Sequence, residues 1–565
     1  MTRRLAMAII VVAVGAAWYV TLPPPPISLT LPAGTTESVR GVIHIHTRRS
    51  DGTGTVDDVA RAAAQAGLKF VVLTDHGDAT REPDGPTYRS GVLCIDAVEI
   101  STSGGHVVAL GLGKAPYPLA GDARDVIEDI ARLGGLSISA HPGSTKPELR
   151  WSDWSAPFDG LEWLNGDSEW RDESPRTLAR VLLAYPGRRS SALALLLDRP
   201  DELLRRWDDL TQRRRVMAIA GSDAHARLGL RTLGEPYDRS ATTLPVPGYA
   251  QVFRTFSITL PQLTLRGNPV DDAAAVIAEI RAGHVYSTID AVAAPAQLSF
   301  TANGTDSSAM PGDEIRPRGP VTVRAATNAP GSDEIRLIRN GEVMASTRGV
   351  MLEQTVPPTP AVYRVEVHFP GAPGEPPVPW ILSNPIYIRA SGQNSVTPPR
   401  PSATRVVARY DNGPATGWRF EKSERASAAL DVIGAIGGTQ LLMRYALGGS
   451  VAEGPFVAFV MPAGSDLATY DRLTFNVRAD HPMRLSVQVR VPEGAAGERW
   501  QRSVYVDGTP RTLTVFFDDM TAVGTTASPR PPLDRVESVL FVVDTVNTKP
   551  GTSGQIWIDD VKYGR

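Results

Sequence analysis

The spacing of apolar residues divides most of the chain into stretches of different character. Between about Val42 and Ile289, short apolar runs such as GVIHIH and FVVLTDH alternate with amphipathic segments. One of these segments, TVDDVARAAAQAGL, predicts a helix with Thr55 as its cap. Repeated strand and helix units of this kind predict an α/β barrel of parallel strands, with functional residues at the carboxyl ends of the strands.

Helical periodicity fades after Ala293. Short β-type runs, including VTVRAAT, YRVEVHF and NPIYIRA, then stand between clusters of Gly, Pro, Asn and Asp, and predict a β-sandwich at residues 293–390. The polar, proline-containing stretch 391–404 predicts a linker. Residues 405–565 again alternate as strands, from LLMRYAL to IWIDDVKY, and predict a second sandwich.

The first residues carry a pattern of their own. Two arginines precede an apolar run from Leu5 to Leu22, which has about the minimum length for a membrane span. Residues 1–27 therefore predict a membrane anchor and a proline-rich spacer, with the rest of the chain on the periplasmic or extracellular side. A cleaved signal peptide is the alternative, although Trp18 and Tyr19 suit a membrane interface.

Composition narrows the classes of function. The chain has 565 residues, enough for about three domains, and a formal net charge of -3, so it lacks the basic field that nucleic acid requires. We therefore expect no nucleic-acid polymer as a partner. The single cysteine, Cys94, excludes an intramolecular disulfide framework.

Histidines and carboxylates gather at the edges of the apolar runs. Six of the nine histidines fall between residues 44 and 225. His44 and His46 are two apart on a predicted strand, so their imidazoles should share one face, as chelating ligands do. An isolated strand histidine is more often a hydrogen-bonded polar group than a ligand. However, the same edges also offer Asp51, His76, Glu99, His106, His141, Asp223 and His225.

This mixture of side chains predicts the kind of ion. Imidazoles with a few carboxylates and no thiolates suit Zn, Mn or Fe, whereas Ca or Mg would prefer oxygen ligands alone. The candidates exceed what one ion can use, so we expect two or three divalent ions.

The ordered series HIHTRRSDG, LTDH, VEI, GH, AHPG and GSDAH resembles the PHP superfamily, named for polymerase and histidinol phosphatase, over residues 38–292. The resemblance implies a distorted barrel of seven strands and helices that holds three ions. It implies a first ion at His44, His46, Glu99 and Asp223, a second at His106, His141 and the bridging Glu99, and a third at Asp51, His76 and His225.

A hydrolytic mechanism follows from the charge of such a cluster. Two close cations lower the pKa of a water molecule between them, so we expect a metal-bridging hydroxide to attack a phosphoester. The catalytic residues would be Glu99, Asp223 and His225. The nearby Arg48, Arg171 and Arg227 are candidates for binding phosphate, although exposed loop arginines are common. The sequence does not assign the group that protonates the leaving group.

Two weaker resemblances keep other functions open. WILSNPIYI, at 380–388, is similar to a segment of extracytoplasmic PHP metallohydrolases related to carbaryl hydrolase, which implies a carbamate, amide or ester as the alternative substrate. The last segment resembles galactose-binding or carbohydrate-binding jelly rolls. Trp418, Trp500 or Trp557 could stack on sugar rings there, although tryptophans in sandwiches more often lie in the core. A non-catalytic, glycan-binding surface protein is therefore the third hypothesis.

Three other polar residues are not predicted to be ligands or nucleophiles. Asp75, beside His76, is expected to lie behind the ligands or in a turn. Ser222 lacks the GxSxG turn of a nucleophile. His284 is expected to be structural.

Overall fold

The computed structural model describes residues 2–31, 38–229, 243–244, 246–331, 333–390, 404–408, 417–435, 438–492 and 497–565. The chain forms two compact units, Met1–Gly113 with Asp122–Gln393, and Lys114–Gly121 with Asn394–Arg565. The predicted linker 391–404 lies outside the described residues except for Thr404.

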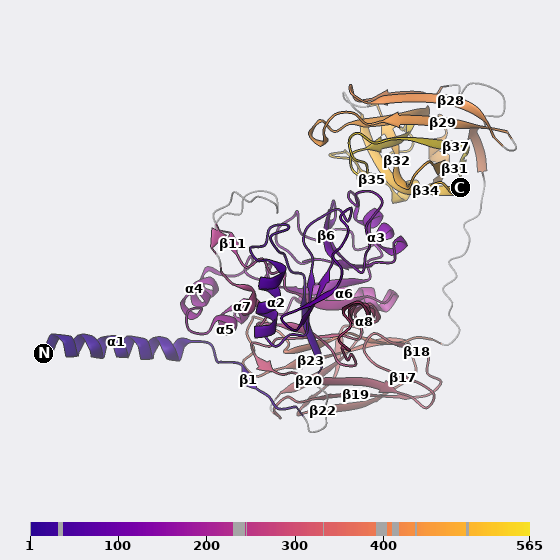
Figure 1. The fold of residues 1–565 in the computed structure, drawn as a ribbon. Helices are drawn as coiled ribbons and strands as arrows, with labels where there is room; N and C mark the ends of the chain where they lie inside the picture. Colours follow the sequence, from indigo (N-terminus) through magenta and orange to yellow (C-terminus); the bar gives the residue numbers. More distant parts are fainter. Residues whose placement is uncertain are drawn as a thin grey trace. The chain divides into compact units, whose positions relative to one another are not determined.

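Two sheets form the α/β part of the first unit (Figure 1). One contains β4 (Thr87–Arg89), β5 (Val92–Asp96), β3 (Phe70–Leu73), β2 (Val39–Ile43), β13 (Ser257–Leu260) and β14 (Tyr286–Thr288), in that order. The other contains β6 (Val98–Thr102), β7 (Gly105–Leu110), β8 (Leu136–Ser139), β9 (Gly160–Asn165) and β10 (Met217–Gly221).

Helices of the first unit connect and cover these strands. Their bounds are α1 (Thr2–Thr21), α2 (Val56–Gln65), α3 (Ala123–Arg132), α4 (Pro175–Ala184), α5 (Arg189–Ala194), α6 (Asp201–Arg213), α7 (Tyr249–Val252) and α8 (Pro269–Ala282). Helix α2 begins at the predicted cap, where the side chain of Thr55 accepts a hydrogen bond from the backbone N–H of Asp58. Helices α2 and α7 share an apolar core with β2, β3 and β5.

The two sheets meet through isolated parallel bridges, one between Ile45 and Ala224 and one between His76 and Glu99. Parallel pairing joins β2 to β3, β3 to β5, β8 to β9 and β9 to β10. In contrast, β7 is antiparallel to both β6 and β8. The mixed α/β architecture matches the prediction, but a seven-unit barrel is not confirmed, because hairpin pairing at β7 interrupts the strand and helix repeat.

The strands predicted as a separate sandwich at 293–390 are continuous with this α/β part. One layer is a four-stranded sheet of β17 (Ser308–Ala309), β16 (Leu298–Asn303), β19 (Val321–Thr327) and β22 (Met351–Val356). The other extends the sheet that contains β2, because β24 (Ile381–Ser383) pairs with β14. Beyond β24 come β23 (Ala361–His368), β20 (Glu334–Arg339), β21 (Glu342–Arg348), β25 (Ile386–Ile388) and β18 (Glu314–Ile315). Two short pairs, β1 (Ile27–Ser28) with β15 (Ala293–Ala294) and β11 (Leu228–Gly229) with β12 (Thr243–Leu244), complete the unit.

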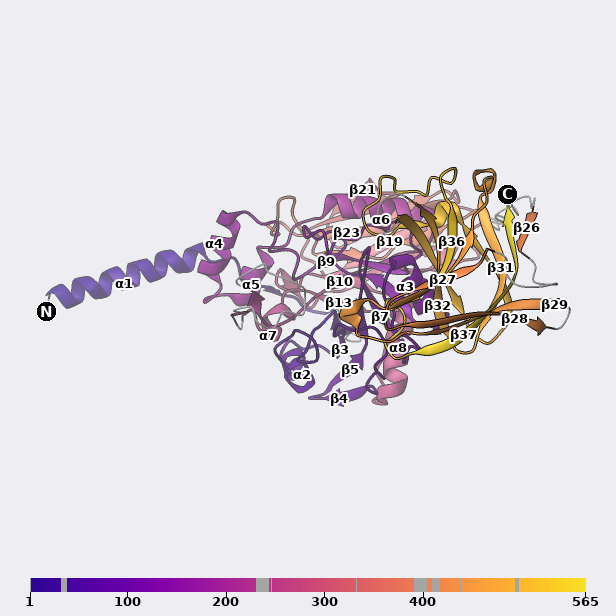
Figure 2. The same cartoon turned by 90° about the horizontal axis from the view of Figure 1, so that it is seen from above.

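The second unit is a sandwich of two six-stranded sheets (Figure 2). One sheet holds β26 (Thr404–Ala408), β28 (Ser427–Ala435), β29 (Gly438–Ala446), β37 (Ser553–Gly564), β31 (Arg472–Ala479) and β34 (Arg511–Phe516). The other holds β27 (Arg419–Lys422), β30 (Phe456–Pro462), β36 (Ser538–Asp544), β32 (Met483–Val491), β33 (Glu498–Val506) and β35 (Thr521–Ala522). Apolar side chains from both sheets form one core, which includes Phe459, Phe475 and Trp500.

The apolar amino-terminal residues form helix α1. The indole N–H of Trp18 donates to the backbone carbonyl of Leu183, just inside the end of α4, with 2.9 Å between the heavy atoms. Among the described residues, no helix is both long enough and apolar enough to cross a membrane. The membrane anchor stays a prediction from the sequence.

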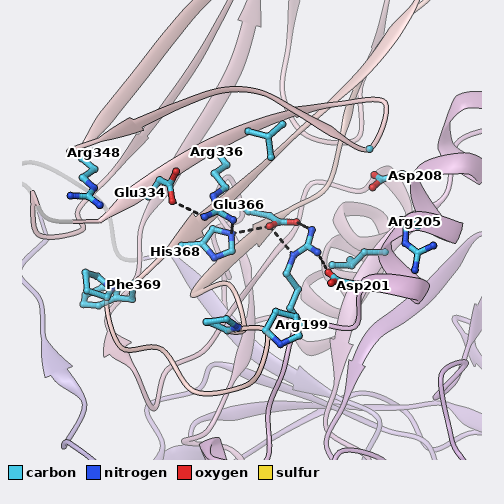
Figure 3. A pocket seen from close by; sticks show the side chains of 16 residues that line it. Arg199, Asp201, Arg205, Asp208, Glu334, Arg336, Arg348, Glu366, His368 and Phe369 are labelled. Atoms are coloured by element: carbon cyan, nitrogen blue, oxygen red, sulfur yellow. Dashed lines mark hydrogen bonds and ion pairs between the residues drawn. The ribbon is translucent and has the colours of Figure 1, made fainter.

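A buried ion-pair network fastens α6 to β23. The guanidinium of Arg364 on β23 donates to both carboxylate oxygens of Asp208 on α6, at 2.7 and 2.9 Å, and also to Glu366. Arg199 donates to the same Glu366 at 3.1 and 2.9 Å (Figure 3). Arg364 is only 2% exposed, so its removal would leave two buried carboxylates short of a partner.

We predict that Arg364→Ala lowers the free energy of unfolding of the first unit by about 3–5 kcal/mol, the usual cost of breaking a buried ion pair. Urea denaturation would measure this change. Arg324→Ala is the matched control, because Arg324 is 54% exposed and lies 4.0 Å from Glu353, so its loss should cost less than about 1 kcal/mol. Equal losses in the two variants would contradict a stabilising role for the network.

Candidate metal centre

The nine side chains proposed as ligands converge where the two sheets of the first unit meet. His44 and His46 follow β2, His76 follows β3, His141 follows β8, and Asp223 and His225 follow β10. Glu99 and His106 come from the hairpin of β6 and β7. Donor atoms lie within 4.8 Å of one another in four sets: His44, His46 and Asp223; His44, Glu99 and His141; His76, Glu99 and His106; and His46, Asp51, His76 and His225.

The carboxylate of Glu99 lies at the middle of the cluster. Its Oε1 is 2.8 Å from His106 Nδ1 and 2.9 Å from His141 Nε2. Its Oε2 is 3.2 Å from the Nε2 atoms of both His44 and His46. The two oxygens therefore face different groups of imidazoles, which is the geometry that a bridging carboxylate requires.

Asp223 lies close to the same two histidines that face Oε2 of Glu99. Asp223 Oδ1 lies 3.3 Å from His44 Nε2 and 3.2 Å from His46 Nε2. Ligands placed 2.0–2.1 Å from a tetrahedral zinc ion stand about 3.3 Å apart. Asp223 Oδ1 and Glu99 Oε2 thus each lie at the distance of a second ligand from the Nε2 atoms of His44 and His46.

Unsatisfied polar atoms give an independent test of this fit. Within the described residues, His44 Nε2, His46 Nε2 and Glu99 Oε2 are buried and have no hydrogen-bond partner. Buried polar atoms without partners are costly and rare in folded proteins. A cation among these three atoms would satisfy all of them, so the residues present fit a metal ion.

The buried carboxylates of the centre favour positive charge on the groups beside them. Burial alone would lower the pKa of His44 and His46, but nearby carboxylates outweigh it: Asp223, Glu162 and Glu99 raise the pKa of His44 well above its ordinary value. Asp223 and Glu99 raise the pKa of His46 to about 10. Bound cations would balance the negative charge of the same carboxylates.

His76, whose Nδ1 lies 3.2 Å from the same Oε2 of Glu99, differs from these two histidines. Burial, with the neighbouring His46 and His106, lowers the pKa of His76 to about 4, although Glu99 and Asp51 oppose this shift. The imidazole of His76 is therefore neutral at physiological pH. A neutral imidazole is the form that binds a metal ion.

The backbone shows that strand alternation is not what brings His44 and His46 together. Strand β2 ends at Ile43, and His44 has a φ of 64°, in the left-handed region that residues other than glycine rarely adopt. Asp223 and His141 also have positive φ, at 46° and 32°. Each such residue costs about 1–3 kcal/mol and is typical of functional sites. The proposed ligands thus come together, but His44 does not lie on the regular strand that the sequence analysis assumed.

Sequence reasoning missed Glu162, which supports two of the proposed ligands from β9. Its Oε1 is 2.6 Å from His44 Nδ1, and its Oε2 accepts a hydrogen bond from the backbone N–H of His141 at 2.8 Å. Donation from Nδ1 leaves Nε2 of His44 for a metal ion. The carboxylate presses against Gly221, where any side chain would collide with it. The available signal was a glutamate in the middle of the apolar strand FDGLEWL.

Asp75 and Ser222 hydrogen-bond to the segments that carry proposed ligands. The carboxylate of Asp75 accepts hydrogen bonds from the backbone N–H and the hydroxyl of Thr47, both at 2.7 Å, and from Ser50. It therefore orders the loop that carries Asp51. The hydroxyl of Ser222 donates to the backbone carbonyl of His44 at 2.6 Å and ties the end of β10 to the end of β2.

The structure separates the three arginines proposed to bind phosphate. Arg227 lies at the centre, where its guanidinium donates to Asp51 at 2.9 Å. Arg171 pairs with Asp167 and covers the ring of Trp170 at 4.7 Å. Arg48 is exposed and donates to the backbone carbonyl of Thr53 at 2.6 Å. Among the contacts described for these three arginines, only the one between Arg227 and Asp51 involves a proposed ligand.

The other histidines lie apart from the cluster. His284 contacts Glu279 and Asp313, at 3.0 and 3.1 Å, which agrees with the structural role expected of it. His368 contacts Glu366 in a hollow of about 750 Å³ (Figure 3). No proposed ligand lines this hollow, and its four carboxylates are held by arginines. The hollow therefore belongs to the ion-pair network between α6 and β23.

Comparison with known proteins gives one partial match of sequence. No family model matches the chain. The 3',5'-nucleoside bisphosphate phosphatase of Chromobacterium violaceum is 33% identical over 123 residues, which is 20% of this chain and 43% of that protein. The match thus spans less than half of the length of the phosphatase.

Among solved structures, carbohydrate-binding modules are similar to part of the chain. The family 11 module of a Clostridium thermocellum cellulosomal cellulase is 16% identical, covering 28% of this chain and 94% of the module, with a TM-score of 0.24. A family 30 module is 12% identical, covering 28% of this chain and 87% of the module, with a TM-score of 0.22. Such TM-scores support no conclusion about fold or ligand. Trp500, one of the three candidate sugar-stacking residues, is fully buried.

We predict that Glu162→Gln weakens the binding of a divalent ion by about 10–100-fold, because His44 loses the carboxylate that orients its ring. Competition with a chromogenic chelator would measure the affinity. Asp290→Asn is the matched control, since Asp290 is also buried but pairs with Arg40 near the start of β2. An unchanged affinity in Glu162→Gln would contradict the supporting role of Glu162.

Proposed function

We propose that this chain is a metal-dependent hydrolase of phosphoesters. The observation that carries the proposal is the convergence of His44 Nε2, His46 Nε2 and Glu99 Oε2, three buried atoms without hydrogen-bond partners among the described residues, beside Asp223. Partial similarity to a bisphosphate phosphatase supports the choice of phosphoesters.

The proposed ligands divide into sets around Glu99. The set of His44, His46 and Asp223 faces Oε2 of Glu99, whereas His106 and His141 face Oε1. Divalent ions held there would supply Lewis-acid chemistry, by activating a water molecule and by neutralising phosphate charge. A further set of donors combines Asp51 with His46, His76 and His225.

The residues around Asp51 are suited to orient a phosphate group. Burial alone would raise the pKa of Asp51, but His225, His46 and His76 hold it well below its ordinary value, so the carboxylate is ionised. That carboxylate fixes Arg227 at 2.9 Å and contacts His225 Nε2 at 3.1 Å. Remaining N–H groups of a fixed guanidinium can bind phosphate oxygens. Arg227 is therefore the arginine that we propose for substrate binding.

We predict that protein stripped by a chelator loses phosphatase activity and regains it with Zn, Mn or Fe. In His46→Ala, kcat/KM for an aryl phosphate should fall by at least about 10³-fold, because the change removes a donor shared by two sets of ligands. His481→Ala is the control, since His481 lies in the second unit and is 36% exposed. Metal content, measured on the same samples, should fall only in His46→Ala.

Three other outcomes would contradict the proposal in different ways. Turnover of carbamates, amides or carboxylic esters without turnover of phosphoesters would favour the alternative hydrolase. Metal-free, inactive protein that binds glycans would favour a surface binding protein. Equal activity in His46→Ala and His481→Ala would place any phosphatase activity outside this centre.

Two expectations from the sequence stay proposals. A location on the periplasmic or extracellular side rests on the residues of the amino-terminal segment alone. Binding of a glycan by the second unit would depend on Trp418 or Trp557, which are partly exposed. The guanidinium carbon of Arg478 already lies over the ring of Trp557, 3.7 Å from the ring centroid.

A further inference from the structure

An apolar pocket of about 280 Å³ opens directly beside the candidate centre. Its lining includes Asp223, His225 and Arg227, which belong to the centre or contact it. The rest of the wall comes from the loop after β9, from α4, from α5 and from residues flanking α7. The wall is built largely of Trp170, Val181, Leu182, Tyr185, Leu196 and Phe256.

The pattern of α4 explains why this wall is apolar. Leu178, Val181 and Leu182 are three and four residues apart, so they lie on one face of the helix, and all three line the pocket. The neighbouring Leu183 does not line it, although the two leucines are almost equally exposed, Leu182 at 70% and Leu183 at 68%. The pocket is thus a specific apolar surface and not a general property of the helix.

The few acidic groups in the wall do not make it a polar site. Asp167 is paired with Arg171. Burial, with Asp198 and Asp172 nearby, raises the pKa of Glu169 well above its ordinary value, which is typical of a poorly hydrated environment. Hydroxyl groups or the polar edge of a nucleobase bound here would lose hydrogen bonds to water and face an apolar wall instead, which is unfavourable.

We infer that this pocket binds the organic part of the substrate, and that the substrates are phosphoesters of apolar alcohols or phenols. This inference rests on the proposed function, because it takes the phosphate to lie at the centre between Asp223, His225 and Arg227. An alkyl or aryl group bonded to that phosphate would extend away from the ligands into the pocket. Phosphoesters of sugars or nucleosides would leave most of the apolar wall without a matching surface.

A series of n-alkyl phosphates, from ethyl to octyl, tests this inference with the full-length, metal-loaded protein. We expect kcat/KM to rise by about fourfold per added methylene group until the pocket is full, the factor that corresponds to about 0.8 kcal/mol per buried methylene. Glycerol phosphate serves as the polar control and should be among the poorest substrates. A kcat/KM that does not change with chain length would overturn the inference.

A matched pair of variants locates the effect in the pocket. Leu182→Asn should lower kcat/KM for octyl phosphate by about tenfold and lower that for ethyl phosphate much less, since a longer chain covers more of the apolar wall. Leu183→Asn should change neither value, because Leu183 has the same exposure but does not line the pocket. Equal effects of both variants on octyl phosphate would overturn the assignment.

A binding measurement separates failure of the inference from failure of the proposed function. 4-Butylphenol, which carries no phosphate, should bind the wild-type protein in a calorimetric titration and bind Leu182→Asn several-fold more weakly. Such binding in a protein that hydrolyses no phosphoester would overturn the proposed function and keep the pocket as an apolar-ligand site. Turnover of phosphoesters with no binding of 4-butylphenol and no dependence on chain length would keep the proposed function and overturn the assignment of the pocket.

Discussion

The buried carboxylate of Glu99, surrounded by imidazoles, is the interaction on which the rest of the site depends. Removing a carboxylate from water is costly unless positive charge and hydrogen bonds compensate for it. Glu99 is only 1% exposed, and its two oxygens lie 2.8–3.2 Å from nitrogen atoms of five histidines. Protonated imidazoles supply part of the compensation, and divalent ions between the same atoms would supply more. The demand for positive charge thus explains both the gathering of histidines and the proposed chemistry.

Local structure around the centre is specialised to hold these groups in place. Three proposed ligands, His44, His141 and Asp223, have positive φ, which the surrounding hydrogen bonds maintain at the expense of stability. Glu162 contacts His44 and the backbone of His141, and the absence of a side chain at Gly221 leaves room for its carboxylate. Such rigid support is what a metal site needs, since ligands must be oriented before the ion arrives. The apolar pocket adds a second, chemically opposite surface beside this charged one.

The sequence predicted the membership of the cluster better than its geometry. Histidines at the ends of apolar runs predicted which side chains come together, because strand ends meet at one edge of a sheet. The conformation of His44 was not predictable, since positive φ at a histidine follows from tertiary contacts and not from local preference. Glu162 escaped notice because it lies inside an apolar run that otherwise reads as an ordinary buried strand. The union of residues 293–390 with the α/β sheet depends on pairing between β14 and β24, almost a hundred residues apart, which alternation alone does not reveal.

The most direct test of the central claim is anomalous diffraction at the zinc absorption edge, from crystals of the full chain grown with Zn. The account predicts a strong anomalous peak about 2.0–2.2 Å from His44 Nε2, His46 Nε2 and an oxygen of Asp223, with Glu99 bound to the same ion. Further peaks should lie near His106 and His141, or near Asp51 and His225. The account would be contradicted by crystals that show no anomalous density at this position and in which Glu99 is hydrogen-bonded directly to protonated imidazoles.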